Sequence, residues 1–244
     1  MIEIFNRYGI KGTFNLNAGR IADNPQKVQL EDLENTYRGH EIATHTFTHP
    51  YLHNLDLGGI SYQLVRDREL LENTLRRPVE GFAYPYGLRK ETEGMVDCLK
   101  CCSIRYARTT TATYRFGLPE DPLRWHPTCH HADARLPELM EKFLAPDNVE
   151  NPQKIKPRLF FIWGHAREFI GKWDDLEQIC KTIGNQEDVW YATNGEIMDY
   201  LTAYQSLRRS INGDYVYNPT DKDIYVMVHH KNVLLEKGKI TTLE

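Results

Sequence analysis

Two histidines in the first fifth of the chain have the spacing of a metal site. His45 and His49 stand in the run His-Thr-Phe-Thr-His-Pro, four positions apart. On a helical turn this spacing places both imidazoles on one face, within reach of a single ion. Neutral imidazole nitrogen suits Zn²⁺ and other borderline divalent metals. A polar loop in which the two histidines pair locally is the alternative interpretation.

A further histidine follows a continuous apolar run. Residues 159–163 read Leu-Phe-Phe-Ile-Trp, which is typical of a strand buried on both faces of a parallel sheet, and Gly164 and His165 come next. Because the pKa of histidine lies near working pH, His165 is a candidate general acid or base. A histidine that only bonds a neighbouring loop would give the same pattern.

Two aromatic segments could complete such a site. Residues 81–87, Gly-Phe-Ala-Tyr-Pro-Tyr-Gly, predict a strand that ends in a rigid turn. Active sites of α/β barrels lie at the carboxyl ends of the strands, where a backbone N–H from this turn could stabilise an oxyanion. Trp125 is a candidate wall for a sugar pocket, because aromatic faces pack on sugar rings, or else a core residue.

Alternating helices and strands must position these residues. Apolar spacing and the Gly and Pro residues that bound it predict helices at 1–8, 28–37, 57–76, 90–101, 136–143 and 174–183, and one capped by Asn194. Strands are predicted at 11–16, 41–44, 79–84, 104–107, 159–163 and 189–192. This order indicates β/α units around a parallel sheet, open or closed into a barrel. From residue 210 onward, short strands predict a small β appendage packed on it.

Composition narrows the class of protein. The 244 residues carry a net charge of −4, with 41% hydrophobic and 26% charged residues, as in ordinary globular proteins. No apolar run approaches the roughly 20 residues of a membrane-spanning helix. The mildly acidic balance, without long Lys/Arg runs, argues against nucleic-acid binding. Among five cysteines, Cys98 and Cys101 form a lone Cys-x-x-Cys, which is weak evidence for a zinc or redox module; reduced, buried thiols are the simpler interpretation.

Taken in order, these segments resemble the polysaccharide deacetylase family, the chitooligosaccharide-deacetylase-like carbohydrate esterases of family 4. The matching segments are Lys11-Gly-Thr-Phe14, His45 to Pro50, Tyr84 to Gly87 and Leu159 to His165, and the resemblance covers about residues 1–205. It implies an α/β fold, a distorted and incomplete (β/α) barrel, which we place at residues 1–209; the β appendage at 210–244 is predicted from the strand pattern alone. It also implies metal-dependent removal of acetyl groups from an N- or O-acetylated polysaccharide or oligosaccharide.

The resemblance assigns roles residue by residue. His45 and His49 match the family's two metal histidines, which together with an Asp hold a divalent ion, usually Zn²⁺. His165 matches the general acid, and the backbone N–H of Tyr86 matches the oxyanion donor. Pro85 and Trp125 match substrate-contacting positions, so the expected partner is a carbohydrate.

The family's first motif, Thr-Phe-Asp-Asp, has no counterpart in this sequence. It normally precedes the helix expected at 1–8 and supplies both the metal-binding Asp and the catalytic base. We therefore expect Met1 to be an internal methionine of a longer natural protein. We also expect this chain to hold metal weakly or not at all, and to catalyse poorly unless another carboxylate substitutes; Glu41 is the nearest acidic residue in sequence.

Other departures affect the histidine of the last motif and the turn. Ala83 stands where the family often has an arginine before Pro-Tyr-Gly, and Arg124 stands where it often has Asp. Asp121 or Asp133 could orient His165, and the sequence does not choose between them.

Two alternatives to a sugar deacetylase remain: a same-fold hydrolase of another amide, and a non-catalytic carbohydrate-binding or structural relative. The compartment, native metal and oligomeric state are not determined by the sequence.

Overall fold

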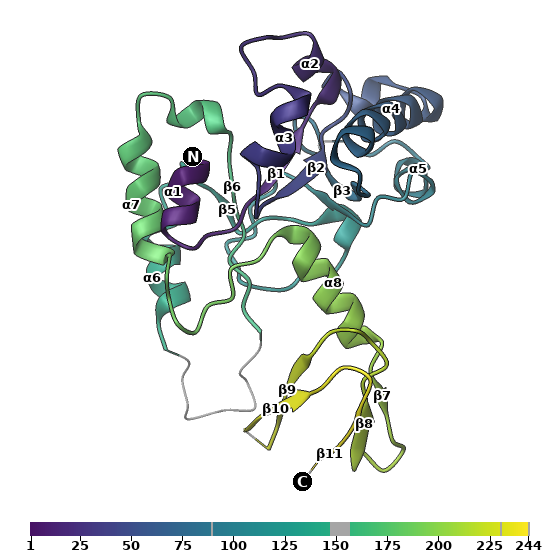
Figure 1. Cartoon of the computed structure of the whole chain (residues 1–244), viewed down its shortest axis with the longest axis vertical. Helices are drawn as coiled ribbons and strands as arrows, with labels where there is room; N and C mark the ends of the chain where they lie inside the picture. Colours follow the sequence, from purple (N-terminus) through teal and green to yellow (C-terminus); the bar gives the residue numbers. More distant parts are fainter. Residues whose placement is uncertain (89, 147–156, 230, 244) are drawn as a thin grey trace. The chain divides into compact units, whose positions relative to one another are not determined.

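A computed structural model describes residues 1–88, 90–146, 157–229 and 231–243 (Figure 1). Its described residues form two compact units. The first contains residues 1–145 and 157–194 and carries the parallel strands; the second contains residues 195–243. The boundary predicted at residue 209 stays a prediction.

The first unit is built on parallel strands. Four of them pair in chain order, β1 (Thr13–Leu16), β2 (Glu41–Thr44), β3 (Gly81–Ala83) and β4 (Tyr106–Arg108). A second parallel pair consists of β5 (Cys129–His130) and β6 (Ile162–Trp163). A parallel bridge between Arg108 and Trp125 links β4 to the segment that leads into β5. The pairings of the described residues do not close these strands into a barrel.

Helices follow the strands as the alternation predicts. The α-helices of the first unit are α1 (Ile2–Arg7), α2 (Ala18–Ala22), α3 (Leu33–Thr36), α4 (Leu57–Leu75), α5 (Met95–Cys101), α6 (Leu136–Leu144) and α7 (Trp173–Ile183). Short 3-10 turns lie at η1 (Leu30–Asp32), η2 (Leu52–Asn54), η3 (Pro122–Arg124) and η5 (Ala166–Phe169). Helix α1 packs against α7 around the buried Ile4 and Leu176 (Figure 1).

Helix α4 shows why the local sequence folds as it does. The Asp56 side chain accepts a hydrogen bond from Gly59 N–H at 2.7 Å, which satisfies a free amide of the first turn. The apolar stripe continues to Leu75, and Arg76 then takes a left-handed conformation, φ 55°. Pro78 follows and cannot continue a helix. The predicted helix at 57–76 is thus confirmed almost residue for residue.

The two faces of the parallel sheet differ in chemistry because strand side chains alternate. One face is apolar: Ile42, Phe82 and Ala107 are buried in clusters with residues of α4. The other face is polar or small, and carries Thr13, Asn15, Glu41, Ala43, Gly81, Ala83, Tyr106 and Arg108, matched across the strands by the register. This second face leads to the predicted site residues.

The second unit is a helix with short antiparallel strands. It contains most of α8 (Asn194–Gln205), and its strands are β7 (Arg208–Arg209), β8 (Tyr215–Tyr217), β9 (Ile224–Val228), β10 (Lys231–Leu235) and β11 (Ile240–Thr242). Buried Ala203, Val216, Ile224 and Leu235 form its core. The predicted strands beyond residue 210 are therefore present.

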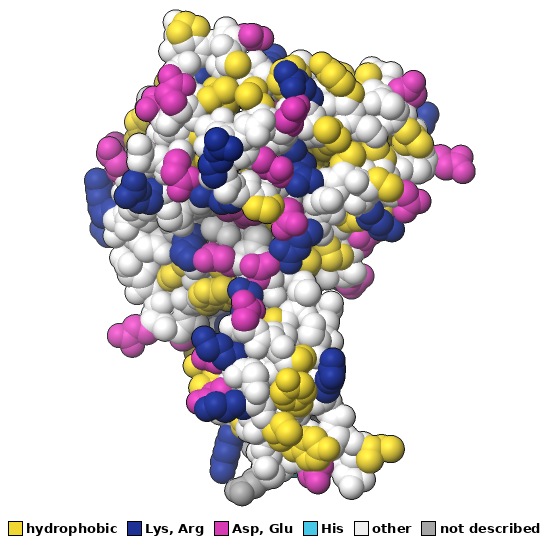
Figure 2. Space-filling view, turned by 45° about the vertical axis from the view of Figure 1, so that its right-hand side comes forward, with side chains coloured by type: hydrophobic (Ala, Val, Ile, Leu, Met, Phe, Trp, Pro, Cys, Tyr) yellow, Lys and Arg dark blue, Asp and Glu magenta, His cyan; other side chains and the backbone are white. Residues whose placement is uncertain are grey.

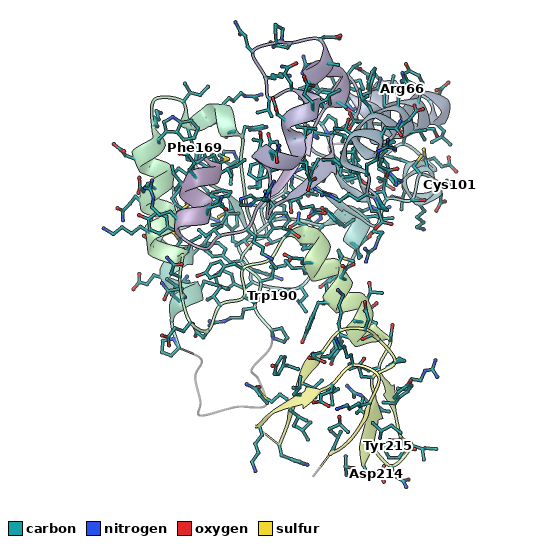
Figure 3. The ribbon with its side chains drawn as sticks, viewed as in Figure 1. Arg66, Cys101, Phe169, Trp190, Asp214 and Tyr215 are labelled. Atoms are coloured by element: carbon teal, nitrogen blue, oxygen red, sulfur yellow. The ribbon has the colours of Figure 1, made fainter. Side chains whose placement is uncertain are left out.

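The α/β class with a parallel sheet is confirmed, but the strand predicted at 159–163 is shorter than expected, with only β6 formed, and the strand predicted at 189–192 is absent. Residues 159–161 are irregular, and the run to Trp163 is half-buried rather than enclosed on both faces. Residues 189–192 form no strand, and Trp190, labelled in Figure 3, is 59% exposed. Apolar runs predict burial without distinguishing a strand from an irregular segment that packs one edge.

The helices and the charged surface can be compared with what membrane-spanning and nucleic-acid-binding proteins require. No helix in the described ranges has both the length and the apolar character that crossing a membrane requires. On the face drawn in Figure 2, acidic and basic side chains are intermixed.

Candidate active site at the strand ends

His45 follows the last residue of β2 and is held by the neighbouring strand. Its Nδ1 lies 2.6 Å from the carbonyl oxygen of Ala83. Because a carbonyl only accepts, Nδ1 carries the proton in the neutral ring and Nε2 keeps its lone pair. Burial lowers the pKa of His45 to about 3, so the imidazole is neutral at pH 7. A neutral ring with a free Nε2 is the form that binds a metal.

Asp67 anchors the backbone on which His45 sits, and the sequence analysis missed it. This fully buried residue of α4 accepts hydrogen bonds from Ala18 N–H at 2.5 Å, from His45 N–H at 3.2 Å and from the Thr44 hydroxyl. Burial raises its pKa to about 6, although these hydrogen bonds oppose the rise. An acid within the apolar stripe Ile60–Leu64–Leu71 was the signal that could have identified it.

His49 lies in a strained turn beside His45. The two ring centroids are 4.7 Å apart. Thr46 and His49 both have left-handed backbones, with φ 69° and 62°, and the Thr46 hydroxyl accepts the His49 N–H at 3.0 Å. Such strain in non-glycine residues tends to cluster at functional sites. His49 Nδ1 is buried without a hydrogen-bond partner among the described residues.

Tyr86 belongs to a tight turn after β3. Gly87 N–H bonds the carbonyl of Tyr84 at 3.0 Å, with Pro85 second in the turn and Tyr86 third at φ 60°. These are the features of a type II turn, which leaves the Tyr86 N–H unused by the turn's own bond. The Tyr86 ring contacts His49, with centroids 4.6 Å apart, and stacks on Tyr51 at 3.8 Å.

His165 follows β6 and is paired with a glutamate three residues later. Its Nδ1 lies 3.1 Å from Glu168 Oε1, and its backbone N–H donates to Glu168 Oε2 at 2.9 Å. Neither aspartate considered from the sequence has this position: Asp121 bonds Arg124, and Asp133 accepts from Tyr114 at 3.0 Å. The i, i+3 spacing of His165 and Glu168 was the available signal.

Two more histidines surround the same carboxylate. Nε2 of His131 lies 2.8 Å and Nε2 of His130 3.3 Å from Glu168 Oε2. Burial tends to raise the pKa of Glu168, but the bonds from His165 and His131 outweigh it and lower the pKa to about 2. Gly164 makes room, because a Cβ there would collide with the His131 ring. Glu168 is therefore an ionised acceptor shared by three histidines.

Ligand atoms of His130, His165 and Glu168 lie within 4.8 Å of one another, a spacing that could hold a metal ion. However, Ala132 N–H donates to His130 Nδ1 at 3.1 Å, so the neutral His130 ring carries its proton on Nε2, facing Glu168. Each close contact is thus already a donor–acceptor pair. The arrangement favours a hydrogen-bonded network over a metal site.

The His45–His49 pair supplies two of the three or four ligands that a zinc site needs. Two neutral rings at short distance offer two nitrogen ligands, whereas protein zinc sites use three or four. The described residues place no third metal-binding side chain in a group with them. Glu41 begins β2, about 13 Å along the strand from His45. It accepts instead from Thr13 at 2.8 Å and Tyr106 at 2.6 Å.

Both residues predicted to contact substrate are buried in the structure. Trp125 is 2% exposed, and its ring packs against Tyr106 and Phe161 at centroid distances of 5.7 and 5.2 Å. Pro85 is also buried. A ring enclosed on both faces offers none to a sugar, so Trp125 is a core residue, the alternative that the sequence left open.

Electrostatics connect the two groups of histidines. The charge of His165 is among the causes that lower the pKa of both His45 and His49. His45 follows β2, Tyr86 follows β3 and His165 follows β6, so each comes after the carboxyl end of a parallel strand. Their chemical roles stay predictions.

The fold and these residues define the class, an α/β protein with a strand-end histidine site. A family model, polysaccharide deacetylase, matches residues 1–103. The resemblance inferred from the sequence is thus confirmed by a family match over residues 1–103. The uncharacterized protein YlxY of Bacillus subtilis (strain 168) is 32% identical over 87 residues, which are 36% of this chain and 26% of YlxY. The chain spans about a quarter of that relative.

Solved structures support the fold. A protein of Mycobacterium smegmatis assigned to the polysaccharide deacetylases has a TM-score of 0.55 at 18% identity, covering 86% of this chain and 78% of that one. A family 4 pseudoenzyme of Bacillus anthracis has 0.52 at 16% identity, covering 81% and 59%. The family 4 domain of a xylanase from the hindgut metagenome of Trinervitermes trinervoides has 0.50 at 15%, covering 82% of each.

Proposed function

We propose that the strand-end site binds a divalent cation, Zn²⁺ by its ligand chemistry, and removes acetyl groups from an acetylated polysaccharide or oligosaccharide. The observation that supports this most is the presence of two different histidine environments at the carboxyl ends of parallel strands, one after β2 and one after β6. One contains neutral rings with an available nitrogen, and the other contains a histidine paired with a carboxylate. A hydrolase that needs both a cation and a proton donor requires this combination.

Each residue would have a defined task. His45 and His49 would hold the cation, which when bound polarises the acetyl carbonyl and acidifies water. The Tyr86 N–H would donate to the oxygen that becomes negative as water adds. His165 would hold a proton on Nε2 and give it to the departing nitrogen or oxygen. Glu168, which accepts from Nδ1, would stabilise the protonated ring and fix its direction.

The general base is not assigned, since the described residues place no carboxylate with His45 and His49. We therefore expect the cation to be held weakly and to be removed by a chelator. The same observation favours the second candidate, a non-catalytic carbohydrate-binding relative. The fold similarity to a pseudoenzyme agrees with either candidate.

Zinc titration by calorimetry tests the site. We expect about one zinc per chain, and at least 100-fold weaker binding in the His45→Ala/His49→Ala double variant. His53→Ala, an exposed histidine of the same loop, is the control and should bind like the parent. Undiminished zinc in the double variant would contradict the proposed ligands. Acetate release from acetylated chito-oligosaccharides with zinc then separates the hydrolase from the non-catalytic relative.

A further inference from the structure

Arg108 carries a buried positive charge without an acidic partner. The residue is 7% exposed, and its hydrogen bond is to the carbonyl of Thr109 at 3.4 Å. Its guanidinium carbon lies 4.7 Å from the centre of the Trp163 ring, a cation–π contact. No salt bridge joins Arg108 to an acid in the described parts of the chain. A guanidinium has five N–H donors, and among the described residues only Nη1 of Arg108 has an acceptor.

Strand register directs this side chain toward the site. Arg108 lies opposite Ala83 across β3 and β4, and Ala83 accepts the His45 Nδ1–H across β2 and β3. Paired residues of neighbouring strands point to the same face of a sheet. Ala83 lies between His45 and Arg108 in the register and has only a methyl group. The charge of Arg108 is also among the causes that lower the pKa of His45.

An unpaired buried charge is costly, and a carboxylate is the anion that fits a guanidinium best. Taking such a cation out of water costs several kcal/mol unless an anion compensates. The planar guanidinium accepts a carboxylate with two parallel hydrogen bonds. We propose that Arg108 forms a carboxylate-binding subsite beside His45, which takes either acetate or the carboxylate of an acidic sugar. Only the link between acetate and the reaction product rests on the proposed function.

Thermal unfolding of the metal-free chain with added ligand tests the subsite without needing turnover. A ligand that binds only the folded state raises the melting temperature by mass action. The probes are acetate, glucuronate as the acidic sugar, and acetamide as a neutral molecule of similar shape. We expect acetate, glucuronate or both to stabilise the parent chain and acetamide to have no effect. Acetate alone would assign an acetyl-sized pocket, whereas glucuronate alone would assign an acidic sugar.

Three variants show whether Arg108 is responsible. Arg108→Met should melt at a higher temperature than the parent without ligand, because an uncompensated charge is gone, and its affinity for the anion should fall at least 10-fold. Arg108→Lys keeps the charge but not the paired bonds, so a loss of about 3- to 10-fold is expected. Arg105→Gln, on the same segment, should bind like the parent.

Two results would overturn the subsite: equal stabilisation by acetamide and acetate, or undiminished acetate binding in Arg108→Met. Neither depends on zinc binding or acetate release. A chain without deacetylase activity can therefore still have this subsite, and an active chain can lack it.

Discussion

The histidines after β2 and those around β6 are held by opposite means. His45 and His49 are kept neutral by burial, and their positions depend on a backbone bond and on left-handed residues. His165, His131 and His130 instead share the ionised carboxylate of Glu168 at the surface. The first group, His45 and His49, suits a metal cation, because neutral imidazoles offer nitrogen lone pairs and do not repel a positive charge. The second suits a proton, because a carboxylate stabilises an imidazolium.

The sharpest contrast between the groups is their response to acid. His45 stays neutral in the folded chain down to about pH 3, whereas an unfolded histidine takes a proton near pH 6.5. The stability that His45 contributes is full above pH 6.5 and is lost as the pH falls toward 3, by up to about 1.4 kcal/mol per pH unit. His45→Asn keeps a donor for Ala83 and cannot titrate.

Chemical denaturation of the metal-free parent and His45→Asn across pH 3 to 7 measures this difference. We expect the parent to lose up to about 4–5 kcal/mol more than the variant over that range. Parallel stability curves would mean that His45 is not buried as a neutral ring, and the contrast between the two groups would disappear.

Removing the Glu168 carboxylate, which the second group of histidines shares, should lower kcat without weakening the binding of substrate or zinc. Glu168→Gln keeps the shape but cannot stabilise a protonated His165, so kcat should fall about 10- to 100-fold with KM within about twofold. Zinc affinity should be unchanged. Nitrogen NMR of labelled histidine gives a readout independent of activity, since the Nδ1–H form of His165 should lose its dominance.

Asp133→Asn is the matched control for Glu168→Gln. Asp133 is close in sequence to His130 and His131, and its carboxylate accepts from Tyr114 rather than from a histidine. It should leave kcat and the His165 spectrum unchanged. Loss of zinc in Glu168→Gln would instead assign the carboxylate to a metal site and contradict the hydrogen-bonded network.

The smallest expected effect concerns the strained turn of the first group. Thr46→Val keeps the shape of a buried side chain but removes the acceptor for His49 N–H, which should cost about 1–2 kcal/mol of unfolding free energy. Zinc binding should weaken with it, because His49 loses its position. Urea unfolding measures the cost, and the exposed Thr48→Val should stay within about 0.5 kcal/mol of the parent. Equal stability of both variants would show that the turn does not depend on this bond.

Local patterns in the sequence determined much of the fold. The capped apolar stripe of α4, the α/β alternation and the position of His45 directly after a strand could all be predicted, because each depends on residues a few positions apart. The strand predicted at 189–192 was wrong because an apolar run does not specify its partner.

Tertiary structure alone decided which residues meet. Glu168 pairs with His131 across 37 residues, and Arg108 lies opposite Ala83 across 25 residues. Trp125 is enclosed by Tyr106 and Phe161, which lie 19 and 36 residues away in the sequence. Spacing predicts which face of its own element a side chain occupies, but not what lies across from it. The sequence therefore determined which histidines this protein offers to chemistry. Packing decided which of them are enclosed by neighbouring strands and which share the Glu168 carboxylate, because these contacts exist only in the folded chain.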